Sequence, residues 1–93
     1  MDKKQYIDRA EQVLYKTYNR FPVVFDHGEG VKLYDTDGQE YLDFGAGIAV
    51  MGLGYSNETF KNALKDQIDK LCHTSNLFYN EPAVEAGEKL LKV

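Results

Sequence analysis

Several features common in functional proteins are scarce or missing from this sequence. Cys72 is the only cysteine among 93 residues, which excludes an internal disulfide framework and is typical of a reducing compartment. No hydrophobic run approaches the length of a membrane span, and the charged start at residues 1–5 has no apolar stretch behind it. We therefore expect a cytoplasmic protein that does not contact a membrane.

The sequence also has fewer basic than acidic residues. Lysine and arginine number 11 against 15 acidic residues, so the net charge is -4, and the two signs are interspersed along the chain. This balance excludes a polybasic membrane surface and the basic patch that a nucleic-acid-binding protein needs, so no nucleic-acid partner is predicted. A hydrophobic fraction of 43% is typical of a globular chain, but 93 residues make one small domain at most.

Residues 25–55 are the centre of the chain. Two alternating runs, Val31–Asp35 and Glu40–Phe44, flank the turn signal at 36–39 and predict a β-hairpin. A short strand at 23–25 precedes them, which makes a three-stranded antiparallel β-meander. Because side chains alternate across a strand, one face of the hairpin is expected to be buried.

The ten residues after the hairpin are rich in glycine. Their four glycines are too costly in backbone entropy for a regular helix or strand. We therefore expect these glycines where the backbone lies close to another group or where φ is positive. They are Gly45, Gly47, Gly52 and Gly54.

Apolar residues at spacings of three and four predict three amphipathic helices, over 3–18, 57–72 and from Asn80 to Val93. Asp2 and Asn80 are the expected N-caps of the first and last helix. Cys72 falls on the apolar side of the second helix, so we expect a buried thiol. The last helical pattern still runs at Val93, which leads us to expect that the natural chain continues.

The sequence contains no complete pattern of a known catalytic, nucleotide-binding or metal site. The glycines satisfy neither the dinucleotide fingerprint nor the Walker A pattern. His27, Cys72 and His73 cannot readily converge on a metal. Ser75 beside His73 is better explained by a turn than by a nucleophile and base. We therefore predict no catalytic, cofactor-binding or metal site within this chain. Four acidic residues of the hairpin are expected to be solvated: Asp35, Asp37, Glu40 and Asp43.

Ordered blocks of sequence nevertheless carry a resemblance. The blocks are Gly28–Gly30, Leu33–Gly38, Tyr41–Phe44, Ala46–Val50, Leu53–Gly54 and His73–Pro82. In this order they resemble the N-terminal part of class III pyridoxal-phosphate (PLP) aminotransferases, over roughly residues 15–93. One position departs from that pattern, because Tyr55 stands where the family usually has histidine.

The resemblance implies a fold. It predicts an α+β chain with an N-terminal helix, the three-stranded antiparallel meander and then two helices, all within a parent of PLP-dependent transferase fold type I. Residues 1–56 would belong to the small domain of that parent, and residues 57–93 would be the connecting helix and the start of the large PLP-binding domain. The Schiff-base lysine and most of the phosphate cradle would lie downstream, so PLP is expected in the parent and not in this chain alone.

The resemblance also implies an activity. The parent would transfer an amino group from N2-acetylornithine to 2-oxoglutarate in arginine biosynthesis, as a homodimer. Ornithine, 4-aminobutyrate and succinylornithine remain alternative donors, and a free-standing binding or scaffold module is the alternative from another class. Four residues match positions of the substrate side of the pocket, although a packing role stays open for each: Tyr18, Ile48, Asn76 and Phe78.

Overall fold

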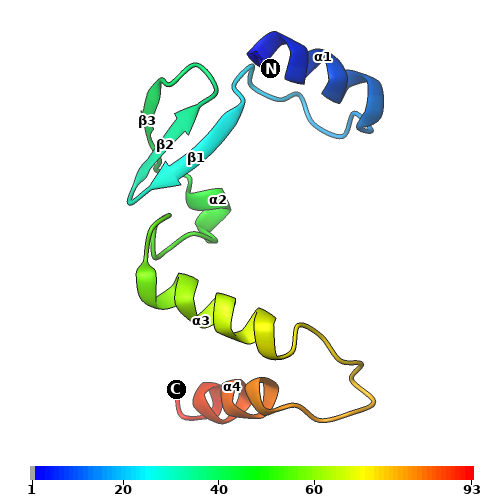
Figure 1. The fold of residues 1–93 in the computed structure, drawn as a ribbon, viewed down its shortest axis with the longest axis vertical. Coiled ribbons are helices and arrows are strands. Elements are labelled where there is room, and N and C mark those ends of the chain that lie inside the picture. The colour runs from blue at the N-terminus through cyan, green and yellow to red at the C-terminus, as the bar shows by residue number, and fades with distance from the viewer. Residues whose placement is uncertain (1) are drawn as a thin grey trace. The chain divides into compact units, whose positions relative to one another are not determined.

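The computed structural model describes residues 2–93, which form two compact units with the division between Glu58 and Thr59. Figure 1 shows the elements in chain order, from α1 at the N-terminus to α4 at the C-terminus. The first unit holds α1, the sheet and a short turn, and the second holds nearly all of α3 together with α4. The expected order of helix, meander and two helices is confirmed.

The first helix, α1, runs from Lys3 to Val13. Asp2 caps it as predicted: its carboxylate accepts the Gln5 backbone N–H at 2.9 Å, and the Gln5 side chain accepts the Asp2 backbone N–H at 2.9 Å. The expected continuation to residue 18 is wrong, because Leu14 already has extended geometry. The tyrosines and threonine that follow Leu14 are weak helix formers, which accounts for the early end.

Three antiparallel strands form one sheet in the order β1-β2-β3. They are β1 Phe25–Glu29, β2 Lys32–Asp35 and β3 Glu40–Leu42. The first strand begins and ends later than the predicted 23–25. Its pairing with β2 reaches Glu29 opposite Lys32, because Gly30 at φ +58° makes the turn much tighter than expected.

The meander is covered only in part. Leu33 is half-buried, but Val31, on the same side, is exposed, and Lys32 and Tyr34 on the other side are half-buried like Leu33. The expectation of one buried face is therefore wrong as stated. No hydrophobic side chain among the described residues is fully buried.

The second unit contains α3, Glu58–Lys70, and α4, Glu81–Leu91. Both helices were predicted from their periodicity, and Asn80 caps α4 by accepting the Ala83 backbone N–H at 3.0 Å, with Pro82 in the first turn. Their apolar stripes remain exposed. The stripe of α3 is Phe60, Leu64 and Ile68, continued by Leu71 just after the helix, and the stripe of α4 is Val84, Leu90 and Leu91. None of the described helices is long and apolar enough to cross a membrane.

Candidate functional site

The least exposed side chain in the described structure is a carboxylate. Asp35, at the end of β2, is 5% exposed. Its oxygens accept the Tyr41 hydroxyl at 2.9 Å and the backbone N–H groups of Asp37 at 2.9 Å and Gln39 at 2.8 Å. The prediction that Asp35 is solvated is therefore wrong, because the turn after β2 folds its own N–H groups back onto this carboxylate.

The surroundings of Asp35 also determine its charge. Burial by itself would raise the pKa of this carboxyl, but the hydrogen bonds from Gln39, Tyr41 and Asp37 stabilise the anion more strongly. The pKa of Asp35 is consequently held below its ordinary value. The hydrogen bond between Tyr41 and Asp35 also raises the pKa of the Tyr41 phenol, because ionising the phenol would remove the proton that it donates to Asp35.

A second carboxylate organises the glycine-rich segment. Asp43, which is half-buried, accepts the backbone N–H of Gly45 at 2.9 Å and of Ala46 at 3.0 Å through Oδ1. The Tyr55 hydroxyl donates to its Oδ2. This bond is the main cause that lowers the pKa of Asp43 and raises that of Tyr55. The expectation that Asp43 is simply solvated is also wrong.

Tyr55 is held in place from the first hairpin turn. Its backbone N–H donates to the Gly30 carbonyl at 2.8 Å, and the Gly30 N–H donates to Ser56 Oγ at 2.8 Å. A Cβ at Gly54, whose φ is +78°, would lie 2.7 Å from that same carbonyl oxygen. The predicted need for close approach is thus confirmed at Gly54.

Between Asp43 and Tyr55 the backbone makes a left-handed turn, labelled α2, at Ala46–Ala49. Its four φ values, in order, are 49°, 61°, 61° and 67°. The predicted need for positive φ is therefore confirmed at Gly47, but three of the four residues are not glycine. A β-branched residue such as Ile48 rarely adopts this conformation, and its side chain is 95% exposed. No regular helix was predicted here.

The structure divides the four candidate pocket residues between the two units. Tyr18 lies in the segment between α1 and β1, 71% exposed, with the Arg20 guanidinium 5.7 Å from its ring centroid. Ile48 lies in the left-handed turn. Asn76 and Phe78 lie in the connection between α3 and α4, where Phe78 donates its backbone N–H to the Ser75 carbonyl at 3.0 Å. That bond, with the Leu77 N–H on Ser75 Oγ at 3.2 Å, gives Ser75 the turn role we expected.

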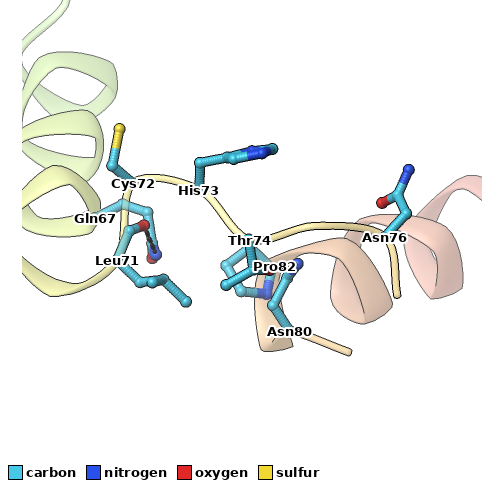
Figure 2. Close-up of a pocket in the computed structure, with 8 residues that line it drawn as sticks. All are labelled: Gln67, Leu71, Cys72, His73, Thr74, Asn76, Asn80 and Pro82. Carbon is cyan, nitrogen blue, oxygen red and sulfur yellow. Dashed lines mark hydrogen bonds between the residues drawn. The ribbon is translucent and has the colours of Figure 1, made fainter. Parts of the chain in front are cut away.

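A cavity of about 250 Å³ lies beside this connection (Figure 2). Asn76 is part of its lining, and Phe78 is not. The other lining residues are Gln67, Leu71, Cys72, His73, Thr74, Asn80 and Pro82. Within it, Asn80 Nδ2 donates to Thr74 Oγ1 at 3.3 Å. Cys72 is exposed, so the expected buried thiol is wrong: α3 ends at Lys70 and its apolar stripe is uncovered.

The ionisable residues of the described chain offer little for chemistry. No group of three or more His, Cys, Asp or Glu residues is placed to hold a metal within residues 2–93. None of the lysines in the described chain is buried. The pKa values of Lys4 and Lys32 are raised, by hydrogen bonds to Asp8 and Glu40, which is opposite to the shift that a nucleophilic amine requires.

Sequence reasoning missed Asp43 and Tyr55 as organising residues. A signal was available, since an aspartate two residues before glycine favours an Asx turn in which its carboxylate accepts a following N–H. Nothing local in the sequence pairs Asp43 with a residue twelve positions later.

Comparison with known proteins establishes the class of protein that this fold and this glycine-rich turn define. The family model described as aminotransferase class III matches residues 13–93. The chain therefore belongs to the class III aminotransferases.

Within that family the chain is similar to acetylornithine aminotransferases. It is 49% identical to the enzyme of Clostridium acetobutylicum over 83 residues, which cover 89% of this chain and 21% of that protein. It superimposes on the crystal structure of acetylornithine aminotransferase from Elizabethkingia anophelis with a TM-score of 0.92 and 33% identity, covering 99% of this chain and 24% of the other. Ornithine delta-aminotransferase from Plasmodium falciparum matches with a TM-score of 0.82 and 26% identity, over 87% of this chain and 21% of the other. The chain thus spans about a fifth of the length of the relatives it matches.

Proposed function

We propose that this chain is part of an acetylornithine aminotransferase, in which it supplies one wall of the amino-acid pocket. The complete enzyme would move an amino group from N2-acetylornithine to 2-oxoglutarate. The observation that carries the proposal is the family match over residues 13–93, together with a TM-score of 0.92 to an enzyme of that name. A free-standing module is disfavoured, because the apolar stripes of α3 and α4 are exposed.

In this proposal four side chains face the substrate. Tyr18 lies near the substrate carboxylate, with Arg20 beside its ring. Ile48 forms an apolar wall, which its almost complete exposure permits. Asn76 and Phe78 approach the active site at the interface of a homodimer. The cytoplasmic location, the homodimer and the assignment of residues 1–56 and 57–93 to small and large domains remain predictions.

PLP is the cofactor that membership of this family implies, and the residues described do not fit its covalent or electrostatic anchors. A PLP site needs a lysine whose amine can lose its proton and a carboxylate for the pyridine nitrogen. The lysines here are exposed or half-exposed, and the two buried or half-buried carboxylates, Asp35 and Asp43, are already engaged by backbone N–H groups and tyrosine hydroxyls. In the complete enzyme those anchors must come from outside this chain.

Ornithine is the second candidate donor. Its support is the likeness to ornithine delta-aminotransferase, at a TM-score of 0.82. Aminotransferases of succinylornithine and of 4-aminobutyrate share the same blocks of sequence by resemblance. They are weaker candidates, because the Clostridium acetobutylicum relative, at 49% identity, is named for acetylornithine.

A chimera tests the proposal. Residues 13–93 would replace the matching stretch of the Clostridium acetobutylicum relative, and kcat/KM would be measured with N2-acetylornithine and with ornithine. We expect activity, with preference for N2-acetylornithine. A folded chimera without aminotransferase activity would overturn the proposal, and a preference for ornithine would replace it by the second candidate.

The same chimera tests the pocket wall. Ile48→Ala should raise KM for the amino donor by about tenfold, since even one or two lost methylenes change discrimination by that order. Lys65→Ala, at an exposed lysine of α3 outside its apolar stripe, is the control. Equal effects of the two substitutions on KM would remove Ile48 from the pocket. Separately, the 93-residue chain mixed with PLP and treated with borohydride should form no stoichiometric lysine adduct.

A further inference from the structure

The left-handed turn at residues 46–49 is the most strained segment of the described chain. For residues other than glycine this conformation is unfavourable, because it brings Cβ close to the following carbonyl oxygen. Ala46, Ile48 and Ala49 all adopt it at once. A strained segment persists only where its surroundings determine it more strongly than its own preferences do.

The surroundings supply very few contacts that could do so. Inside the turn, the Gly45 carbonyl accepts the N–H groups of Ile48 at 2.9 Å and Ala49 at 3.1 Å, and the Ala46 carbonyl accepts those of Val50 and, at 2.8 Å, Met51. From outside, Asp43 Oδ1 receives the N–H groups of Gly45 and Ala46, at the point where the backbone enters the left-handed region. Side-chain packing contributes little at Ile48 and Ala49, which are exposed, whereas Ala46 is half-buried.

The Asp43 carboxylate is itself held in place. Its second oxygen receives the Tyr55 hydroxyl, and Tyr55 is tied to the Gly30 turn of the sheet by its backbone. The ring also lies against β1, where a Cβ at Gly28 would come within 2.6 Å of Tyr55 Cγ. Both ends of the segment that contains the turn are thereby joined to the sheet, one at Asp43 and one at Tyr55.

We propose that Asp43 and Tyr55 form a clamp that imposes the left-handed turn on residues 46–49 and so fixes the position from which Ile48 meets the substrate. Asp43 and Tyr55 are positioning residues that act through the backbone of the turn. The last step, contact of Ile48 with an amino-acid substrate, rests on the proposed function, whereas the clamp itself does not.

The test uses the 93-residue chain and NMR spectroscopy. Positive φ gives a strong contact between the amide and α protons of the same residue, which can be followed at Ala46, Ile48 and Ala49. Tyr55→Phe removes only the hydroxyl, and Asp43→Ala removes the carboxylate. We expect both substitutions to weaken the positive-φ signature, and Asp43→Ala to make exchange of the Ala46 amide proton at least about tenfold faster, because it loses a charge-assisted hydrogen bond. Tyr79→Phe, at an exposed ring, is the control and should change neither.

A rescue experiment separates this positioning role from a general structural one. Glycine accepts positive φ without the Cβ cost, so Ala49→Gly in the Asp43→Ala chain should restore the signature at Ile48. Contacts between β1 and β2 report in the same spectra whether the sheet is intact. A retained signature in Asp43→Ala, or no recovery on adding Ala49→Gly to a chain whose sheet is intact, would overturn the clamp. If Asp43→Ala disrupts the sheet, Tyr55→Phe decides alone: an unchanged signature overturns the clamp and a weakened one supports it. Failure of the chimera above would instead overturn the substrate assignment and leave the clamp standing.

Discussion

Tyr55 donates its hydroxyl to the Asp43 carboxylate twelve positions earlier in the chain, and this bond joins the end of the meander to the residue that follows the glycine-rich segment 45–54. By the resemblance in sequence, class III aminotransferases usually have histidine at the position of Tyr55. Tyrosine reaches Asp43 with a donor that stays protonated through the physiological range, since its ordinary pKa is about 10.

The first prediction concerns pH. Asp43 has a pKa below its ordinary 3.8, so its contribution to stability is present above that value and is lost as pH falls through the lowered pKa. Tyr55 has a pKa above its ordinary 10.0, so its contribution is present below 10.0 and is lost as pH rises through the raised pKa. The bond should therefore stabilise the fold between these limits and fail at both extremes.

Ultraviolet titration of the tyrosines checks the alkaline limit. The absorbance of Tyr55, obtained as the difference between the parent chain and Tyr55→Phe, should titrate above pH 10. In Asp43→Asn that component should move to lower pH, because the acceptor has lost its charge. A Tyr55 component that titrates at the same pH in both chains would contradict the assignment.

The second prediction concerns the buried carboxylate. Asp35→Asn keeps the shape of the side chain but removes the charge that receives Tyr41 and two backbone N–H groups. We expect the thermal midpoint to fall by about 5 °C or more, measured by circular dichroism. Asp37→Asn alters an exposed aspartate in the same turn and should leave the midpoint within about 2 °C. Similar losses for the two substitutions would show that burial of Asp35 does not matter.

Glycine substitutions provide the third prediction. Gly54→Ala places a Cβ 2.7 Å from the Gly30 carbonyl oxygen at a φ of +78°, so both a clash and backbone strain oppose it. We expect a loss of about 2 kcal/mol or more in the free energy of unfolding, from denaturant titration. Gly52→Ala meets no atom within 4 Å and should stay within about 0.5 kcal/mol of the parent. The close approach would be refuted by a neutral Gly54→Ala.

The fourth prediction concerns the start of α4. Asn80→Ala removes the side chain that accepts the Ala83 N–H at 3.0 Å and donates to Thr74 at 3.3 Å. Loss of an N-cap of this kind costs about 1 kcal/mol, so helix content and thermal midpoint should both fall. Asn62→Ala, inside α3, has the opposite expectation, because alanine is the better helix former. An unchanged helix signal in Asn80→Ala would count against the cap.

Local patterns predicted most of the elements. The stripes of α3 and α4, the caps at Asp2 and Asn80 and the turn at 36–39 are all confirmed, because each depends on residues within about four positions of one another. The end of α1 was predicted five residues too late, because only the apolar spacing was followed. The apolar spacing continued past Val13, but weak helix formers followed it and little tertiary packing was available to compensate.

The special backbone of the glycine-rich segment 45–54 could be predicted, but its detailed geometry could not. The ordered blocks suggested Ile48 as a pocket residue, which stays a prediction, and the unusual cost of the glycines around it pointed to positive φ. Which residues take that φ was not readable from the sequence, since alanine and isoleucine ordinarily avoid it. Asp35 and Asp43 were wrongly predicted to be solvated. Strand alternation indicates the side of the strand on which a carboxylate lies, but it does not indicate which hydrogen-bond donors lie near that carboxylate.

By itself, then, the sequence determined the family, the element order, the helix caps and the hairpin turn, because family blocks and local hydrogen-bonding preferences are written in short stretches of residues. Only the tertiary structure decided that Asp35 is buried, that Gly54 lies against Gly30 and that Tyr55 reaches Asp43 over the left-handed turn. These contacts join residues six to twenty-six positions apart, as from Tyr41 to Asp35 and from Ser56 to Gly30. Forming such a contact requires the chain between its two residues to close into a loop, at a cost in entropy. Local preferences along the chain therefore do not predict these contacts.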